Sequence, residues 1–560
     1  MVVKIKVDME KVLLMLFFSV ILFLGPGQLF DHKIKHDFPF AYGASDAFQH
    51  QIRAEAIKDM GNFRYEADYI SLGLENVVGT YPPVSYHLGV ILSYLAGIET
   101  YDSLYFIILF FPIVGSIAMF FIIREYNRIA ALLSLPLSMI IFSSPITIGF
   151  LWGHWPSILA QSFLIFFFWG IMRMDLNKSY FLIAMALSAV ALTHTAAAIF
   201  AIMFLILFFG IKLAFKGIRK QDIKTIAAAS AVSFLVSFYY LVIFWNTWAK
   251  AQPYSFGIEP ASLGTPMFYI AGFGLLLLPM AIGMIFSLSK LKDLHISLVL
   301  AFAMLLFGFL NYAGFSLRAF QVRFFWPIYL SVFFGFGLYI AIKFIIKKQS
   351  YLAASFIFIL LLISFSGIIK FPIIWQTEVQ SIPSIPYSNI AASQGLMDPY
   401  HWEALNWISE NTEKDALIFF FYGDIYNQDA LLRNAKRVHY QAWENEFIKS
   451  LQERKIKRQY YTELPGDSGA GLLARASFFK FENAHGSKTE GFSEGERDVC
   501  LYDYYVFDRA SRQEALAQYN LLIASEMIKK DYISVVFQNE VVLILKNNNP
   551  GADCIEERSF

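Results

Sequence analysis

Two short tracts are expected to decide the fold of this chain: GASDAFQH at residues 43–50 and YPPVSYH at residues 81–87. Both lie in one long polar segment that follows a first apolar run and precedes many more. The first tract brings an acidic residue to the membrane surface, and the second is a rigid Pro-Pro turn that leads back toward the bilayer. Together they indicate chemistry at a lipid head group.

The composition is that of a membrane protein with a globular extension. Of 560 residues, 57% are hydrophobic and only 16% are charged, against about 25% charged in soluble domains. Apolar runs of membrane-spanning length, roughly 17 to 25 residues, recur from residue 11 to residue 371, and ordinary globular sequence follows. We therefore predict a polytopic α-helical membrane domain at 1–372 and a soluble α/β domain at 373–560.

About eleven spans are predicted, and one further apolar stretch, 84–98, is too short to be another. The predicted spans are 12–30, 103–123, 129–150, 156–172, 179–193, 196–215, 225–246, 266–288, 295–313, 323–343 and 350–371. As a helix, 84–98 would be about 22 Å long, and the hydrocarbon core is about 30 Å thick. We expect it to be a re-entrant or interfacial helix.

The basic residues of short loops fix the orientation, because they stay on the cytoplasmic side. If 84–98 does not cross, these residues gather on the side of the N-terminus, and only Lys250, Arg318 and Arg323 lie opposite. If it crosses, every later loop changes sides. We expect a multi-pass protein of the plasma membrane with a cytoplasmic N-terminus. The first outer loop, 31–102, and the C-terminal domain are then extracytoplasmic.

The tail, 373–560, has mixed helix and strand patterns. The expected elements are a helix at 400–408 that ends at Asn411-Thr412, a buried strand at 416–421, a hairpin of 533–537 with 541–545, and a further strand at 519–523. Acidic residues outnumber basic ones in this tail, so nucleic acid is not an expected partner. Cys500 and Cys554 are the two cysteines; they form one disulfide or none, and spacing does not decide.

Polar side chains at the predicted outer ends of the spans are the candidate site. They are Asp46, His50, Tyr81, His87, His154, His194, Glu259, Arg318 and Arg323. Transfer of a sugar from a lipid phosphate needs a carboxylate that takes the acceptor's proton, and cations or a divalent metal that stabilise the departing phosphate. Asp46 is the candidate catalytic residue. The candidate ligands for substrate or donor phosphate are Tyr81, His87, His154, His194, Arg318 and Arg323, the arginines because their fork matches phosphate oxygens.

The first loop also allows purely structural roles. Asp46 and Gln49 have the spacing of a capping box, so Asp46 could simply start a helix. His50 stands one turn from Asp46, and the two are candidate ligands of a divalent metal, Mg²⁺ or Mn²⁺. The tract 81–83 could do no more than begin the next helix.

The remaining candidates have structural alternatives too. His154 lies in a short interfacial loop between Trp152 and Pro156, where aromatic anchoring is usual. His194 could cap a helix junction. Arg318 and Arg323 oppose the positive-inside bias, and contact with lipid phosphates or with the acidic tail would also account for them.

With these residues in place, the chain resembles the type-C (GT-C fold) integral-membrane glycosyltransferases, in particular prokaryotic members that use polyprenyl-phosphate sugars. The resemblance rests on GASD at 43–46, the Tyr-Pro-Pro entry at 81–83, the turn from Arg124 to Arg128, and the tail that begins WEALNWISENT at 402–412. It covers most of the chain. The order of these elements is more specific than any one of them.

The resemblance implies an enzyme that transfers a sugar from a polyprenyl-phosphate donor on the outer face, with Asp46 as base or metal ligand. The acceptor would be a glycan, a lipid or a protein, and membrane lipids would surround the spans. Two features depart from the superfamily pattern. There is no Trp-Trp-Asp-x-Gly motif, and His154 stands in the loop 150–156 where many relatives have an acid. The first departure does not support transfer of a whole oligosaccharide to asparagine.

Two other functional classes remain open at this point. A transporter or flippase for a lipid-linked or polar solute would also be polytopic, although no inverted repeat is evident. A membrane scaffold whose tail binds a partner is the third alternative. No linear pattern encodes the identity of the sugar.

Overall fold

The computed structural model describes residues 8–560 of the chain with gaps. The gaps are 72, 74–75, 80, 143–147, 177, 246–273, 314–325, 347–349, 367–394, 424, 427–428, 463–473, 478–479, 484–494 and 512. The predicted domain boundary at 372/373 lies in the third of the long gaps, so it stays a prediction.

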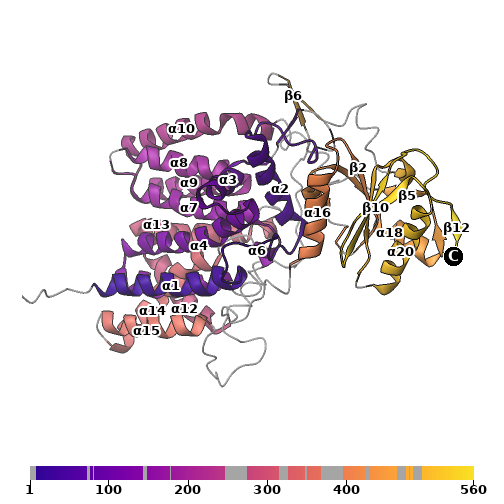
Figure 1. The fold of residues 1–560 in the computed structure, drawn as a ribbon. Helices are drawn as coiled ribbons and strands as arrows, with labels where there is room; N and C mark the ends of the chain where they lie inside the picture. Colours follow the sequence, from indigo (N-terminus) through magenta and orange to yellow (C-terminus); the bar gives the residue numbers. More distant parts are fainter. Residues whose placement is uncertain are drawn as a thin grey trace, which may run out of the picture.

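Helices occupy each of the eleven predicted spans, wholly or in part, and lie side by side in a bundle (Figure 1). They are α1 (Met9–Leu29), α4 (Thr100–Arg124), α5 (Arg128–Ser134) continued by η1 (Leu135–Phe142), α7 (Trp155–Met172), α8 (Ser179–Ala191), α9 (Thr195–Phe215), α10 (Lys220–Phe244), α12 (Leu277–Ser289), α13 (Ile296–Gly308), α14 (Trp326–Ile346) and α15 (Tyr351–Ser366). Six of those described are long and apolar enough to cross a membrane on their own, and the others are shorter. The predicted fold class of a polytopic helical membrane protein is confirmed.

One end of the bundle, the basic end, is held by ion pairs between successive loops. Arg124 at the end of α4 pairs with Glu10 of α1. Arg173 after α7 lies 2.5 Å from Glu125, and Arg219 before α10 pairs with Asp175. The N-terminal part of α1 and the tail lie at opposite ends of the bundle (Figure 1), so the basic residues gather far from the tail.

The other end, the tail-side end, carries the elements between α1 and α4. These are α2 (Ser45–Met60), β1 (Val77–Val78) and α3 (Val84–Ala96), with α6 (Ile148–Leu151) beside them. The predicted helix at 84–98 forms as α3, about 20 Å long. Ser103 Oγ of α4 donates to the Gly89 carbonyl of α3 (2.7 Å). The Val84 amide donates to the Leu192 carbonyl between α8 and α9 (3.0 Å). These contacts hold α3 at the tail-side end.

A five-stranded mixed sheet is the centre of the tail. Its order is β10-β11-β9-β2-β3, with β2 parallel to β3 and β9 and the other pairs antiparallel. The strands are β2 (Leu417–Phe420), β3 (Val438–Gln441), β9 (Tyr504–Asp508), β10 (Ile533–Gln538) and β11 (Val542–Asn547). The predicted strand at 416–421 and the predicted hairpin are confirmed.

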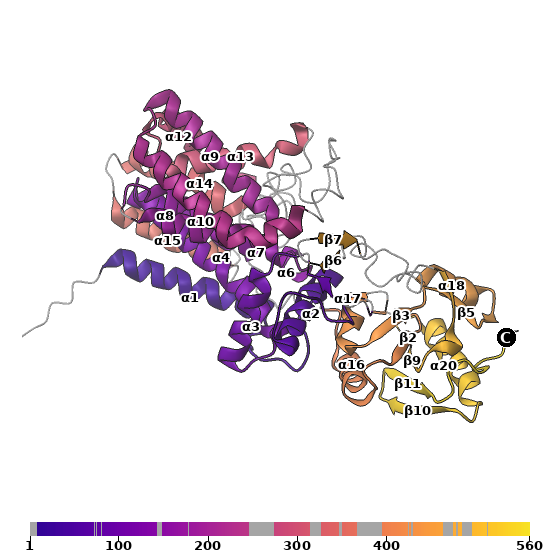
Figure 2. The same ribbon diagram turned by 90° about the horizontal axis from the view of Figure 1, so that it is seen from above.

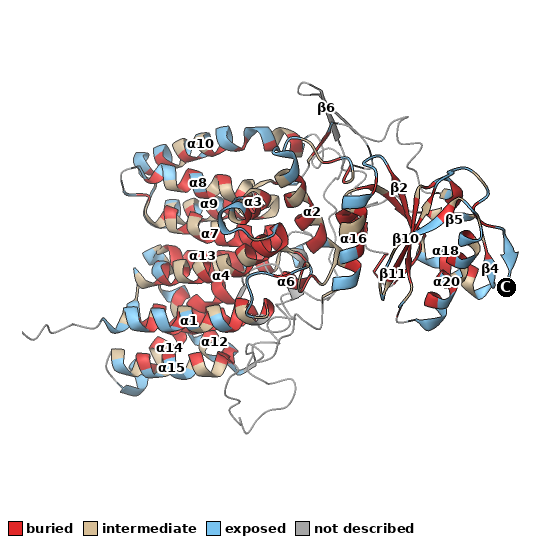
Figure 3. Cartoon of the chain, viewed as in Figure 1, coloured by how far each residue is buried: buried red, intermediate tan, exposed pale blue. Residues whose placement is uncertain are grey.

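Helices cover both faces of this sheet. α16 (Pro399–Asn411) lies between the sheet and the bundle, and α18 (Glu444–Gln452) and α20 (Glu514–Ile528) lie beyond it (Figure 2). On β2, Ile418 and Phe420 belong to the core shared with α16, whereas Phe419 belongs to the core shared with α20. Burial on both faces explains why this strand is apolar without alternation, and Figure 3 shows buried residues concentrated on the central strands of the sheet.

The strand predicted at 519–523 is wrong, because this segment lies inside α20. The buried residues of α20 include Leu516, Tyr519, Asn520 and Ile523. Their spacing of three and four residues is that of one helix face, and the short apolar run was not by itself able to distinguish strand from helix.

Smaller elements complete the tail, and one of them pairs with the first loop. They are α17 (Asp429–Leu432), η7 (Arg433–Ala435), β4 (Lys455–Ile456), β5 (Gln459–Thr462), β6 (Ala474–Ser477), β7 (Lys480–Asn483), β8 (Gly495–Asp498) and β12 (Arg558–Ser559). β1 of the first loop pairs with β6 of the tail, Val77 opposite Arg475. Cys500 and Cys554 form a disulfide, which answers the question that their spacing left open.

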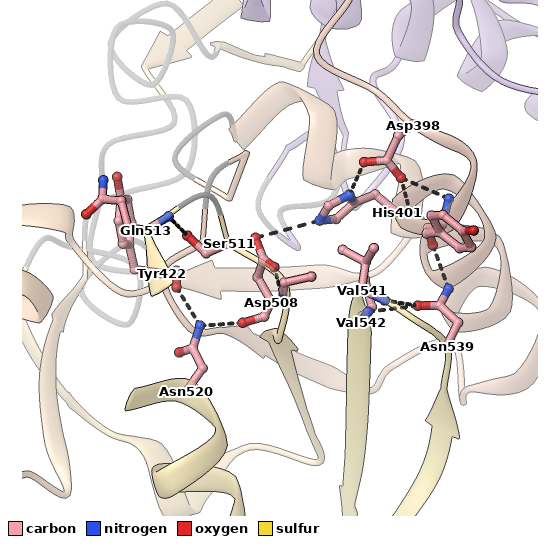
Figure 4. Close-up of polar contacts among 12 residues, drawn as sticks. Asp398, His401, Tyr422, Asp508, Ser511, Gln513, Asn520, Asn539, Val541 and Val542 are labelled. Carbon is pink, nitrogen blue, oxygen red and sulfur yellow. Dashed lines mark hydrogen bonds and ion pairs between the residues drawn. The ribbon is translucent and has the colours of Figure 1, made fainter. Parts of the chain in front are cut away.

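α16 is fastened to the sheet by a histidine between two carboxylates (Figure 4). His401 Nδ1 lies 2.5 Å from Asp398 Oδ2, and its Nε2 lies 3.9 Å from Asp508 Oδ2. Asp398 also caps α16 by accepting from the Tyr400 and His401 amides. Burial alone would lower the pKa of His401, but Asp398 and Asp508 outweigh it and raise that pKa to about 9.

This arrangement predicts a pH-dependent stability of the tail. The pKa of His401 is higher in the folded state than its ordinary value of 6.5. Protonated His401 therefore contributes on the order of 1–3 kcal/mol to the free energy of unfolding. This contribution is full below about pH 6 and is lost as the pH rises through 9. Thermal unfolding of the full chain in detergent, followed by near-ultraviolet circular dichroism, should show a midpoint that falls between pH 7 and pH 10. His401→Gln should flatten this dependence; an unchanged pH profile in that variant would contradict the assignment.

Candidate active site

Asp46 is the second residue of α2 and its side chain is exposed. The N-cap is Ala44, and no side-chain capping bond is made. The amide oxygen of Gln49 instead accepts from Arg53 Nη1 (2.7 Å), so the capping box suggested by the spacing does not form. A carboxylate in the first turn of a helix is favoured by the helix dipole.

The loop before α7 sits directly on the start of α2. The Gly43 amide donates to the Leu151 carbonyl (2.8 Å). Gly153 has φ +85°, and a Cβ there would overlap the backbone of Asp46 and Ala47. Only glycine allows both this conformation and this approach. The contact brings His154, the next residue, to the same place as Asp46.

His50 is buried one turn after Asp46, beneath this loop. Its Nδ1 lies 3.0 Å from the Tyr86 hydroxyl, and its ring also hydrogen-bonds the Gly153 backbone. Burial, followed by the charges of Arg53, His154 and His194, lowers the pKa of His50 to about 3. His50 is therefore neutral at physiological pH and acts as a fixed hydrogen-bonding group.

The predicted metal ligands, Asp46 and His50, do not complete a metal site with other described residues. No group of three His, Cys, Asp or Glu side chains with the placement to hold a metal occurs in the described part of the chain. The contacts of His50 with Tyr86 and Gly153 also engage its ring. The described residues therefore do not by themselves form a complete metal site.

Arg53 supplies a cation on the same face of α2. Its Nε lies 3.1 Å from Glu66 Oε1, and its guanidinium lies 5.0 Å from the centre of the Tyr81 ring. Burial opposes the charge of Arg53, but Glu66 outweighs it and raises the pKa above its ordinary value. The spacing of Asp46, His50 and Arg53, four and then three residues, is that of one helix face. That signal was present in the sequence and was missed.

The tail contributes a second guanidinium. Arg433 is buried, with Nη2 2.7 Å from Asp429 Oδ2 in the tail, and its Nη1 lies 3.2 Å from Gln49 Oε1 of α2. The side-chain oxygen of Gln49 therefore accepts hydrogen bonds from both Arg53 and Arg433. No linear pattern could have found Arg433, because the contact spans most of the chain.

The structure brings most of the predicted residues together. The ring of Tyr81 lies 5.6 Å from that of His50. His194 is the N-cap of α9 and is close enough to His50 to affect its pKa. His87 instead contacts Phe63 (ring centres 4.9 Å apart). Arg318 and Arg323 lie outside the described residues, so their predicted roles remain untested.

The resulting cluster joins an exposed carboxylate, two guanidinium groups and three imidazoles at the tail-side end. Its members come from α2, from the turn before α3, from the loop before α7, from the turn before α9 and from the tail. A carboxylate can accept a proton, and guanidinium groups bind anionic oxygens. The cluster has the groups for acid–base chemistry on an anionic substrate.

The close approach at Gly153 gives a testable consequence. In Gly153→Ala the left-handed conformation should cost about 1 kcal/mol, and the overlap with Asp46 and Ala47 should add to that. Gly217→Ala is the matched control, because Gly217 has φ +74° with nothing within 4 Å. Thermal unfolding of the full chain in detergent should show a clearly larger loss for Gly153→Ala. Equal losses would mean that the loop does not sit on α2.

Comparison with known proteins identifies the fold. No family profile and no curated protein matches this chain. Among solved structures, the Archaeoglobus fulgidus oligosaccharyltransferase in the apo form is similar with a TM-score of 0.55 and 13% identity, over 89% of this chain and 69% of that one. ArnT from Cupriavidus metallidurans in the apo state is similar with a TM-score of 0.52 and 10% identity, over 95% and 97%.

The same oligosaccharyltransferase, tethered to an acceptor peptide, is similar with a TM-score of 0.53 and 12% identity, over 89% of this chain and 69% of that one. Both similar proteins have the GT-C fold. At these identities the likeness concerns the fold alone. The resemblance that the sequence indicated is confirmed at that level.

Proposed function

From a GT-C fold and an exposed acid at its tail-side end, we propose that this chain is a membrane glycosyltransferase. It transfers a sugar from a polyprenyl-phosphate-linked donor to an acceptor on the outer face of the membrane. The observation that carries the proposal is the position of Asp46, which is exposed, lies under the Gly153 loop and precedes by three residues Gln49, the side chain that Arg53 and Arg433 both contact. A similar structure, the Archaeoglobus fulgidus oligosaccharyltransferase AglB with a TM-score of 0.51, is a complex with an inhibitory peptide and a dolichol-phosphate.

In the proposed reaction Asp46 is the general base. It takes the proton of the acceptor nucleophile as the new bond to the anomeric carbon forms. The bond between that carbon and the phosphate oxygen breaks, and the electron pair leaves with the lipid phosphate. Arg53, with Arg318 and Arg323 as further candidates, balances the charge on the departing phosphate. Neutral His50 holds Tyr86 and the Gly153 loop in place.

The other predicted ligands differ in how well their contacts support them. Tyr81 stacks on Arg53 and, with His154 and His194, lies around His50, which suits all three to bind donor-phosphate oxygens. The contact of His87 with Phe63 lends no support to a role for His87 in binding.

Two observations support an outward-facing tail. The disulfide between Cys500 and Cys554 is typical of an oxidising compartment. The basic residues at the opposite end of the bundle, among them Arg124, Arg173 and Arg219, follow the bias of cytoplasmic loops. The cluster around Asp46 would then face outward, at the edge of the outer leaflet.

The proposal predicts the behaviour of Asp46→Asn. Loss of the general base should reduce transfer at least 100-fold without affecting membrane insertion. The assay follows radioactive mannose, glucose and galactose, fed to the producing cells, from the lipid-phosphate fraction into delipidated products. Asp68→Asn is the control, because Asp68 is another exposed acid of the same loop. Undiminished transfer in Asp46→Asn would remove Asp46 from the mechanism.

A further inference from the structure

A second, polar groove lies between the first loop and the tail. Its walls include Gln51 and Glu55 of α2, Tyr101 of α4, and Trp402 and Asn406 of α16. Its volume is about 420 Å³, within the range of pockets that take small ligands. None of the residues assigned above to sugar transfer lines it.

Helix geometry separates this groove from the cluster around Asp46. At 100° per residue, Gln51 and Glu55 point about 140° and 180° away from Asp46 around the axis of α2. On the facing helix, Trp402, Asn406 and Glu410 recur every four residues and line the groove. The opposite face of α16, with Ala404, Leu405 and Ile408, is buried against the sheet.

The groove has the half-buried Trp402 ring, supported by the buried Tyr101 ring, with polar groups around it. The rings of Trp402 and Tyr101 meet edge to face at 5.6 Å, and the Tyr101 hydroxyl donates to the His36 carbonyl (2.8 Å), which fixes its ring. Amide and carboxylate groups of Gln51, Asn406 and Glu410 stand around these rings. Ring faces bind the apolar C–H face of a sugar, and amides and carboxylates bind its hydroxyl groups.

Two buried polar atoms on the groove wall lack partners among the described residues. They are Gln51 Oε1 and His36 Nε2, on side chains of residues 1% and 8% exposed. His36 Nδ1 lies 2.8 Å from Asp102 Oδ1, which leaves Nε2 as the ring nitrogen without a partner among the described residues. A buried polar atom left without a partner costs about 1–3 kcal/mol. Hydroxyl groups of a ligand would supply these partners.

The charges of the groove exclude an anionic ligand. Four acidic residues line it, Asp37, Glu55, Glu99 and Glu410, against Lys35 and Lys436. The ammonium of Lys436 is already paired with Glu55 (3.3 Å) and Asp59 (2.5 Å). The polar walls also make the groove unsuited to a polyprenyl chain.

We propose that this groove is a saccharide-binding site that takes a short neutral oligosaccharide. It is distinct from the cluster around Asp46 and goes beyond the transfer reaction, because binding here requires no chemistry at Asp46. A peptide is the less favoured ligand, since the groove offers a ring platform and scattered polar groups but no open strand edge among its described walls.

The test is saturation-transfer NMR on the full chain in lauryl dimethylamine oxide, because maltoside detergents carry a sugar of their own. The probes are maltotriose, mannotriose and triacetylchitotriose, with trigalacturonate as an anionic comparison. At least one neutral trisaccharide should bind, and trigalacturonate should bind more weakly. Trp402→Ala should weaken binding at least tenfold. Asn406→Ala, a half-buried position, should weaken it at least threefold and covers the case in which Trp402→Ala does not fold.

Asp46→Asn should bind the trisaccharide as the unmodified chain does, which separates this site from the transfer site. The proposal is overturned if no neutral trisaccharide binds. It is also overturned if binding survives both α16 substitutions or depends on Asp46, or if unglycosylated peptides bind where the trisaccharides do not.

Discussion

The docking of the tail onto α2 is the interaction on which the rest of the structure depends. Arg433 reaches Gln49 from the tail, and Lys436 pairs with Glu55 and Asp59. Burying a guanidinium is costly unless it is paired, and Asp429 and Gln49 supply partners for Nη2 and Nη1 of Arg433. Without this docking, the cluster around Asp46 would lose one of its two guanidinium groups, and the groove would lose the wall that α16 forms.

α2 lines both the cluster around Asp46 and the groove, because it is held from both sides. The Gly153 loop and His50 fix the face that carries Asp46, and α16 stands opposite the other face. His401 in turn fastens α16 to the sheet. The cluster around Asp46 and the groove are therefore positioned by one helix, and both depend on where the tail sits relative to the first loop.

Features encoded locally were predictable, and features made by tertiary contact were not. The spans, the hairpin after residue 533 and the helix at α16 follow from hydrophobic runs, turn residues and caps that lie within a few residues of one another. The segment 519–523 was misread as a strand because its short apolar run hides the helical spacing that starts at Leu516. Arg53 was recoverable from its spacing to Asp46. Arg433 and the groove were not, because they arise from residues far apart in the sequence.

Cross-linking of the tail to α2 tests this docking most directly. The described cysteines are both in the disulfide, and the sequence has no others, so cysteines introduced as Asp59→Cys and Lys436→Cys would be the reactive pair. A short bifunctional thiol reagent should join them in native membranes, and joining Asp59→Cys to Lys530→Cys should fail. Equal yields for the two pairs, or no product for the first, would contradict the docked arrangement.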